Sequence, residues 1–212
     1  NMIDRGVVFQ AGDFNYHRFF NITSEHNKAY AKTLDADYYL FKDNNFSKRH
    51  MSWFKVYKLL YLLQKGYKWV LMLDGDAVVT NQEKDIIKYV KLDNTIFDIF
   101  VCSDGVDSMP WNFNCGVMLL RNSNIVKKFI TNIINCNNKL HYFERNWEQN
   151  AAHDEVKFNP GAYKNKIKIY NKNLFNHNSE WIFHPCFYQN ITDDEKEKYL
   201  NIKIKNPRQH LF

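Results

Sequence analysis

The sequence predicts an α/β fold with a central, mainly parallel β-sheet flanked by helices. Three short apolar runs, at 7–11, 37–41 and 68–73, have the length and composition of buried strands. Stretches with helical patterns separate these runs, so the chain alternates between strand and helix up to residue 73. This order is typical of parallel strands joined by right-handed crossovers.

The first crossover helix is expected from about residue 21 to residue 34. Residues 23–25, Thr-Ser-Glu, resemble the polar start of a helix. The run at 7–11 precedes this helix and leads into a loop at 12–13, and the run at 37–41 follows it. We therefore predict strand, helix and strand over this part of the chain.

The clearest helix is predicted from Met51 to Gln64. Its apolar residues recur at helical spacing and form one stripe, which consists of Trp53, Val56, Tyr57, Leu60 and Leu63. Lys55, Lys58 and Gln64 fall largely outside that stripe. Gly66 is well placed to end the helix, and the run at 68–73 follows directly.

The second half of the chain continues the alternation. The expected elements are a short helix at 84–91, a strand at 97–102, a polar loop leading into an apolar strand at 111–120, a helix capped by Asn122 and Ser123, a helix starting at 147–153, a strand at 167–170 and an apolar segment at 181–186. Residues 192–212 are rich in Asp, Glu and Lys and are expected to form a polar, solvated tail. Because the sequence shows no linker or repeat, we expect a single domain over residues 1–212.

Composition narrows the possible partners. A hydrophobic content of 45% and a charged content of 25% are typical of a globular protein. The net charge of +6 favours an anionic ligand, but the lysines and arginines are scattered, so no nucleic-acid partner is indicated. No apolar run approaches the length of a membrane span. The four cysteines lack Cys-x-x-Cys spacing, which argues against a zinc site.

Two acids, Asp74 and Asp76, follow the central apolar run with only Gly75 between them. Ligands of open α/β sheets bind outside the carboxyl ends of the strands, so both acids are expected at the binding edge. Two close carboxylates repel each other unless a cation compensates them, and such hard oxygen ligands suit Mg²⁺ or Mn²⁺. The pattern predicts a divalent ion that holds a diphosphate, and the alternative is a simple turn after a strand.

Four segments together make the chain resemble a GT-A type glycosyltransferase. More narrowly, it is similar to glycosyltransferase family 34, which contains galactosyl-, mannosyl- and xylosyltransferases. The four segments are the helix and Asp-x-Asp strand from Trp53 to Ala77, the Asn-x-Gly strand from Phe113 to Asn122, the acid-Gln pair Glu148-Gln149, and the late histidine His184. The second segment is also similar to family 8. The resemblance spans about Arg5 to Gln189 and implies a single Rossmann-like GT-A domain.

The chain differs from the family pattern at three places. Trp147 stands where the family has an additional acid, Pro185-Cys186 replaces a glycine-containing sequence, and no lysine closely follows His184. These differences concern the phosphate-binding C-terminal loop and the acceptor specificity.

The resemblance implies metal-dependent transfer of a sugar from a nucleotide-diphosphate sugar to a hydroxyl acceptor, with retention of anomeric configuration. The implied donor is a UDP-sugar rather than a GDP-sugar. The acceptor is a glycan, protein or small molecule. The implied ligands of Mn²⁺ or Mg²⁺ are Asp74, Asp76 and His184, with His177 as the substitute for His184. The expected donor-binding residues are Gln10, Ala11, Gly12, Asp13, Asp74, Gly75, Asp76, Asn114 and Gly116, and the implied catalytic residues are Glu148 and Gln149.

Structural interpretations of the same residues stay open. His184 could be a packing residue, Asn114 and Gly116 could form a turn before a strand, and Glu148 could stabilise a helix start.

Two other functions also stay open. One is a haloacid-dehalogenase-like phosphatase with Asp74 as nucleophile, although Asp193-Asp194 lacks the preceding apolar strand that its second acidic site needs. The other is a catalytically inactive module that binds nucleotide sugars or glycans. The location is also open: a Golgi lumen, if an N-terminal anchor was removed, or else the cytoplasm or a virus factory. The oligomeric state is open as well.

Overall fold

The computed structural model of the chain describes residues 3–46, 49–105, 111–143, 147–186, 191–209 and 211. Its strands are β1 (Val7–Gly12), β2 (Asp37–Lys42), β3 (Trp69–Leu73), β4 (Val78–Val79), β5 (Ile99–Ser103), β6 (Phe113–Arg121), β7 (Ile167–Tyr170) and β8 (Ile182–Phe183). Its helices are α1 (His17–Thr33), α2 (Ser52–Lys65), α3 (Ile86–Tyr89), α4 (Asn124–Ile134), α5 (Leu140–Phe143), α6 (Trp147–Phe158), α7 (Pro160–Tyr163) and α8 (Asp193–Lys205), with 3₁₀ turns at Phe14–Tyr16 and Leu92–Asn94.

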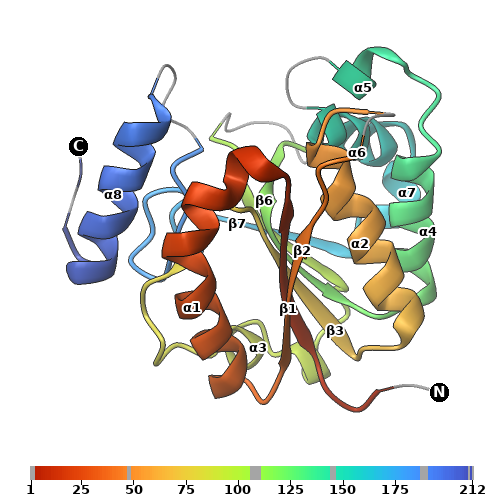
Figure 1. Ribbon diagram of the computed structural model, residues 1–212. Helices are drawn as coiled ribbons and strands as arrows, with labels where there is room; N and C mark the ends of the chain where they lie inside the picture. Colours follow the sequence, from red (N-terminus) through yellow and green to blue (C-terminus); the bar gives the residue numbers. More distant parts are fainter. Residues whose placement is uncertain are drawn as a thin grey trace.

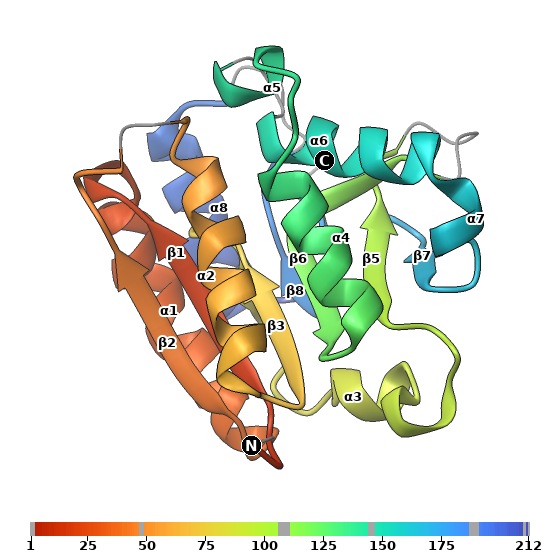
Figure 2. The same ribbon diagram turned by 90° about the vertical axis from the view of Figure 1, so that its right-hand side faces the viewer.

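Six strands form the central sheet in the order β2-β1-β3-β6-β5-β7 (Figures 1 and 2). The pairs β1–β2, β1–β3 and β5–β7 are parallel, whereas β6 is antiparallel to both of its neighbours. The prediction of a mainly parallel α/β sheet is therefore confirmed. Because β6 runs in the opposite direction, its first residues lie at the same edge as the last residues of β3 and β5. Residues 113–116, expected in the loop before a strand, are part of β6.

Helices cover both faces of the sheet. Helices α1 and α8 lie on one side and α2 and α4 on the other, as Figure 1 shows. Successive residues of β3 point to opposite faces. Accordingly, Val70 packs with Trp53 and Phe129 beneath α2 and α4, and Leu71 belongs to the separate core on the other face. Every residue of β3 is buried, which explains its unbroken apolar sequence.

The helix predicted from Met51 to Gln64 is α2. Gly66 ends it in the left-handed conformation, with φ of 98°, as its position in the sequence predicted. Helix α1 begins at His17, four residues before the predicted start, so Thr23 lies inside the helix rather than at its cap. The Thr23 side chain is fully buried, and its hydroxyl donates a hydrogen bond to the Gly75 carbonyl. The apparent start signal is thus a tertiary contact.

The expectation of a solvated C-terminal tail is corrected by α8. A capping box starts this helix: the Thr192 hydroxyl accepts from the Glu195 amide, and the Glu195 carboxylate accepts from the Thr192 amide. Leu200 is fully buried in a small cluster with Phe19, Val78 and Phe183. The helix could not be recognised from the polar composition of this segment, because it packs through few apolar residues.

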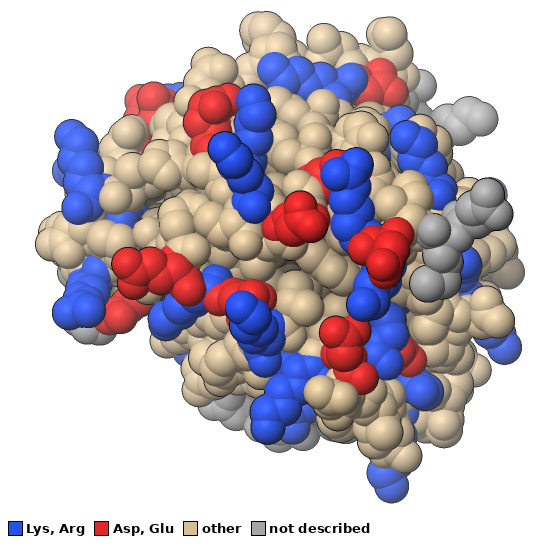
Figure 3. Space-filling view, turned by 90° about the horizontal axis from the view of Figure 1, so that it is seen from below, with Lys and Arg blue, Asp and Glu red and all other residues tan. Residues whose placement is uncertain are grey.

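Charged side chains are spread over the surface. On the face seen from below in Figure 3, lysines and arginines are interspersed with acids among the described residues. No helix in the described part of the chain has the length and apolar character needed to cross a membrane.

Candidate active site

The Asp74-Gly75-Asp76 segment forms a tight turn at the carboxyl end of β3. The Ala77 amide donates to the Asp74 carbonyl at 3.0 Å, and the Asp74 amide donates to the Gly116 carbonyl of β6 at 2.7 Å. Gln10 supports the turn from below, because its side-chain amide donates to the Asp74 carbonyl at 3.0 Å. Gln10 is fully buried. Gln10 was predicted to bind the donor, and in this structure its side-chain amide holds the Asp-x-Asp turn.

Two carboxylates and one imidazole converge above this turn. Ligand atoms of Asp74, Asp76 and His184 lie within 4.8 Å of one another. His184 Nε2 lies 3.3 Å from Asp76 Oδ1 and 3.6 Å from Asp74 Oδ2. Asp76 and His184 are buried, and Asp74 is partly open to solvent. The structure thus brings together the three residues predicted as metal ligands.

His184 is held in place from two directions. It follows β8, which pairs with β4, the strand that follows the Asp-x-Asp turn. Its Nδ1 lies 2.9 Å from the side-chain oxygen of Asn176, an interaction that leaves Nε2 facing the carboxylates. Such a contact through the other ring nitrogen fixes the orientation of a metal-binding imidazole.

Gly116 makes room for this imidazole. A Cβ atom added to Gly116 would lie 2.0 Å from His184 Cε1 and 2.5 Å from His184 Nδ1. No side chain could occupy that position without displacing the ring. The glycine of the Asn-x-Gly segment therefore lets His184 lie against the backbone of β6.

A network of amides lies next to the acids. Asn114 donates to Asp104 Oδ1 at 3.2 Å and accepts from the Gly116 amide at 2.7 Å. Gln149 donates to Asp104 Oδ2 at 3.0 Å and accepts from the Cys115 amide at 3.0 Å. Asp104 therefore joins the two predicted residues, and its place after a strand is the one sequence feature that could have pointed to it.

Lys55 is a buried cation between two acids. Its ammonium lies 2.5 Å from Asp74 Oδ1 and 2.8 Å from Glu148 Oε1, and the residue is only 6% exposed. Burial opposes the charge, but Asp74 and Glu148 outweigh it and raise the pKa of Lys55 well above its usual value. Lys55 could not be selected from the sequence as a site residue, because it falls outside the apolar stripe of α2.

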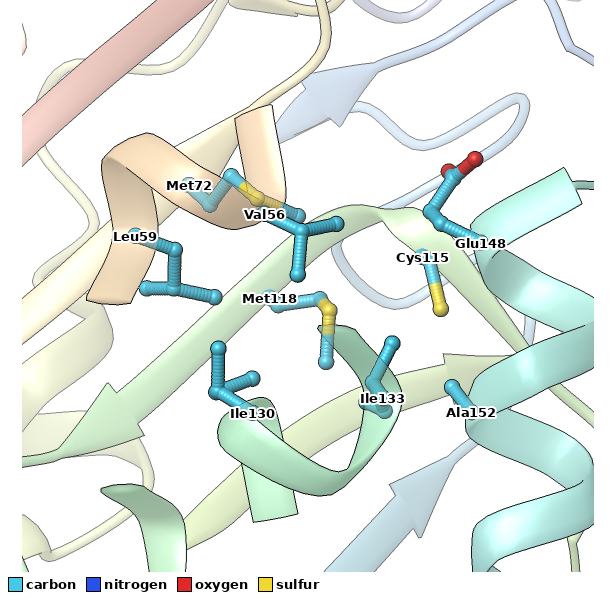
Figure 4. Close-up of a pocket in the computed structure, with 9 residues that line it drawn as sticks. All are labelled: Val56, Leu59, Met72, Cys115, Met118, Ile130, Ile133, Glu148 and Ala152. Carbon is cyan, nitrogen blue, oxygen red and sulfur yellow. The ribbon is translucent and has the colours of Figure 1, made fainter. Parts of the chain in front are cut away.

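Glu148 offers one carboxylate oxygen to the site. Its Oε1 pairs with Lys55, whereas its Oε2 is buried and has no hydrogen-bond partner among the described residues. A small apolar cavity of about 10 Å³ lies beside it, and Figure 4 shows the carboxylate pointing away from the apolar side chains. The cavity is too small and too apolar to hold a ligand.

Lys196, on α8, is a second cation of the site. Its ammonium donates to Asp76 Oδ2 at 2.9 Å. Burial would raise the pKa of Asp76, but the charges of Lys196 and His184 outweigh it and lower that pKa far below its usual value. Two ion pairs from Arg18 to Asp194 and Glu197 fasten α8 to α1. No lysine closely follows His184 in the sequence. In the folded protein Lys196, twelve residues after His184, lies at the site.

The remaining predicted residues lie around this centre. Ala11, Gly12 and Asp13 end β1 at the same sheet edge, and Asp13 is used as a cap that accepts from the Asn15 amide at 3.0 Å. His177 lies beside the cluster and is not one of its three members. Burial, His184 and Lys172 lower the pKa of His177 to about 3.

No family model and no curated protein matches the chain. Among solved structures, a glycosyltransferase involved in the glycosylation of the major capsid of PBCV-1 superimposes with a TM-score of 0.70 at 12% identity, over 93% of this chain and 99% of the other. A manganese, UDP-Gal and xylobiose complex of a mutant Drosophila β1,4-galactosyltransferase 7 gives a TM-score of 0.51 at 11% identity, over 92% and 79%.

A synthase also shares the architecture. The 4-diphosphocytidyl-2C-methyl-D-erythritol synthase of Anaerococcus prevotii DSM 20548 gives a TM-score of 0.55 at 10% identity, over 95% of this chain and 99% of the other. At these identities the comparisons establish the fold alone. The chain has the Rossmann-like GT-A fold.

Proposed function

We propose that the protein is a metal-dependent glycosyltransferase that moves a sugar from a nucleotide-diphosphate sugar, a UDP-sugar, to a hydroxyl acceptor. The observation that carries this proposal is the convergence of Asp74, Asp76 and His184 at the carboxyl end of β3. The manganese and UDP-Gal bound by the Drosophila neighbour, which has the same fold, agree with it.

The donor set fits a divalent cation. Carboxylate oxygens and one neutral imidazole suit Mn²⁺, and two carboxylates suit Mg²⁺ equally well. When bound, such an ion supplies Lewis-acid stabilisation of the negative charge on the leaving diphosphate. The ligand residues in this chain are Asp74, Asp76 and His184.

The amide network is suited to a sugar ring. Asn114 and Gln149 both offer amide groups that can donate to and accept from hydroxyls, and Asp104 fixes their orientation. The buried Glu148 Oε2 needs a donor, which a sugar hydroxyl would supply. In this proposal Glu148 also stabilises positive charge that develops at the anomeric carbon.

We also propose that anomeric configuration is retained. Gln149 is a neutral amide engaged by the Cys115 amide and Asp104, so it is a poor nucleophile. Glu148 is paired with the buried Lys55. A same-face displacement, in which the leaving phosphate takes the proton of the acceptor hydroxyl, needs no protein nucleophile.

The phosphatase alternative is not favoured by the structure. Its second acidic site would be Asp193 and Asp194, but they lie in the first turn of α8, and the Asp194 side chain is 85% exposed and paired with Arg18. An inactive binding module would share the whole site, so only a turnover measurement separates it from an enzyme.

Calorimetric titration of UDP and GDP, with Mn²⁺ and with EDTA, tests the proposal. We expect metal-dependent UDP binding in the wild type and none in Asp76→Asn, while Asp93→Asn, which changes an exposed acid outside the site, binds as the wild type does. UDP-sugars are then screened for release of UDP with a range of acceptors. If neither nucleotide binds in the presence of metal, the proposed diphosphate site is wrong. Binding without any turnover would favour the inactive module.

A further inference from the structure

The candidate metal site already contains two protein cations. Lys55 pairs with Asp74 and Glu148, and Lys196 pairs with Asp76. With His184 neutral, as metal ligation requires, three carboxylates face two ammonium groups. The cluster therefore carries a net charge of only one negative unit, which is low for a site that holds a divalent cation.

The two lysines differ in what they can do for a ligand. Lys55 is buried beneath the acids and bridges two of them. Lys196 reaches Asp76 from α8 and is only partly buried. It contacts Oδ2 of the carboxylate whose Oδ1 faces His184. A divalent ion bound by Asp76 would thus share one carboxylate with an ammonium group.

The position of Lys196 is set by folded structure. The capping box at Thr192 starts the helix one turn before Lys196, and the Arg18 ion pairs hold the adjacent turns against α1. The Lys196 ammonium also lies 5.7 Å from the centre of the Phe19 ring. Its approach to Asp76 is therefore supported on several sides, and the charge cannot be treated as a freely moving surface lysine.

We infer that Lys196 makes metal binding conditional on a diphosphate. Its ammonium repels a divalent ion at Asp76 and so weakens binding of the ion alone. A diphosphate attracts both cations, which removes the conflict and brings Lys196 into contact with the phosphate oxygens. Metal and nucleotide then each raise the affinity for the other by the same factor. This inference rests on the proposed function, because it assumes that the site takes a nucleoside diphosphate.

Mn²⁺ binding, followed through the electron paramagnetic resonance signal of free Mn²⁺, tests the inference with and without UDP. The variant is Lys196→Met, which keeps an unbranched side chain only one heavy atom shorter and removes its charge. Lys196→Arg retains the charge, and Lys198→Met changes an exposed lysine of the same helix. Thermal melts of all variants report whether each is folded.

Lys196→Met is expected to change the two affinities in opposite directions. Mn²⁺ alone should bind at least about tenfold tighter than to the wild type, because a nearby positive charge is gone. UDP in the presence of Mn²⁺ should bind more weakly, and the factor by which UDP improves Mn²⁺ binding should shrink. Lys196→Arg and Lys198→Met should both retain the coupling of the wild type.

Two results would overturn the inference in distinguishable ways. If Lys196→Met binds Mn²⁺ alone no tighter than the wild type, while the wild type still binds UDP with metal, Lys196 does not control the site and the proposed function stands. If the wild type binds UDP neither with nor without Mn²⁺, the proposed function fails and the inference fails with it.

Discussion

Gly116 shows how one missing side chain can determine a site. The His184 ring occupies the volume that a Cβ atom would need, and the same ring faces Asp74 and Asp76 through Nε2. The requirement is one of space. A residue in the middle of a strand thereby decides whether an imidazole from a distant segment reaches the acids.

Gly116→Ala is expected to weaken Mn²⁺ binding in the presence of UDP by at least about tenfold, because the methyl group displaces His184 and disturbs the support of a metal ligand. Calorimetry measures this effect. Gly161→Ala is the matched control, since a Cβ atom there would meet nothing within 4 Å. Wild-type affinity in Gly116→Ala would show that His184 is not a ligand.

His177 is expected to make stability depend on pH. Its pKa is about 3 in the folded protein, against about 6.5 in an unfolded chain. Above about pH 6.5 the ring is neutral in both the folded and the unfolded state, so it does not make the free energy of unfolding depend on pH. As the pH falls from about 6.5 towards 3, only the unfolded state takes up the proton, so the free energy of unfolding falls.

Urea denaturation at pH 7.5, 5.5 and 4.5 tests this prediction. His177→Asn introduces a residue that tolerates the positive φ of 53° at this position, and it removes the titrating ring. The variant should lose less stability than the wild type on acidification. Parallel pH profiles for His177→Asn and wild type would contradict the assignment.

At this scale the sequence predicted the three residues of the Asp-Asp-His cluster but not the two cations beside it. Asp74 and Asp76 were identifiable because they end an apolar strand, and His184 because of a family resemblance. Lys55 was not identifiable, because a lysine beside an apolar stripe ordinarily faces water. Its two partners, Asp74 and Glu148, become apparent only in the folded structure. Lys196 pairs with an acid 120 residues away, so no local pattern could select it.

At the scale of elements, the direction of β6 is the main addition to the sequence-based prediction. A parallel strand would carry residues 114–116 to the opposite edge of the sheet, away from Asp74. The antiparallel pairing of Leu73 with Val117 places them beside the Asp-x-Asp turn instead. Strand lengths and apolar runs could be read from the sequence, but strand direction depends on tertiary pairing and could not.

Helix α8 begins with a capping box at Thr192. Thr192→Ala is expected to lower the free energy of unfolding by about 1 kcal/mol, because the Glu195 amide at the start of the helix loses the hydroxyl that accepts its hydrogen bond. Chemical denaturation measures the change, and amide hydrogen exchange should show faster exchange over 193–205. Thr192→Ser keeps the hydroxyl and should remain close to wild type. Equal stability of Thr192→Ala and wild type would show that the cap is dispensable.

At the scale of the whole molecule, the site is assembled from parts that are distant in the sequence. The acids follow β3, the amides come from β6 and α6, and the two lysines come from α2 and α8. Helices α2 and α6 pack into the core on one face of the sheet, β3 contributes to the cores on both faces, and α8 packs through a third, small cluster. The site therefore requires both faces to be folded at once.

Unfolding is accordingly expected to be one cooperative transition. Far-UV circular dichroism, tryptophan fluorescence and Mn²⁺-dependent UDP binding should be lost at the same denaturant concentration, as expected for a single domain. Trp53 and Trp181 lie in different cores, so fluorescence reports on both. Loss of UDP binding well before the loss of structure would indicate that part of the site folds independently.

The environment of Cys186 gives the site a chemical reporter. Its thiol is exposed and lies 3.6 Å from the Asn114 side-chain amide, in the network proposed to hold the sugar. Cys102 and Cys115 are buried, and burial raises the pKa of both thiols, which suppresses their alkylation. Occupancy of the proposed sugar site can therefore be followed by mass spectrometry as protection of the Cys186 sulfur, without any knowledge of which sugar is bound.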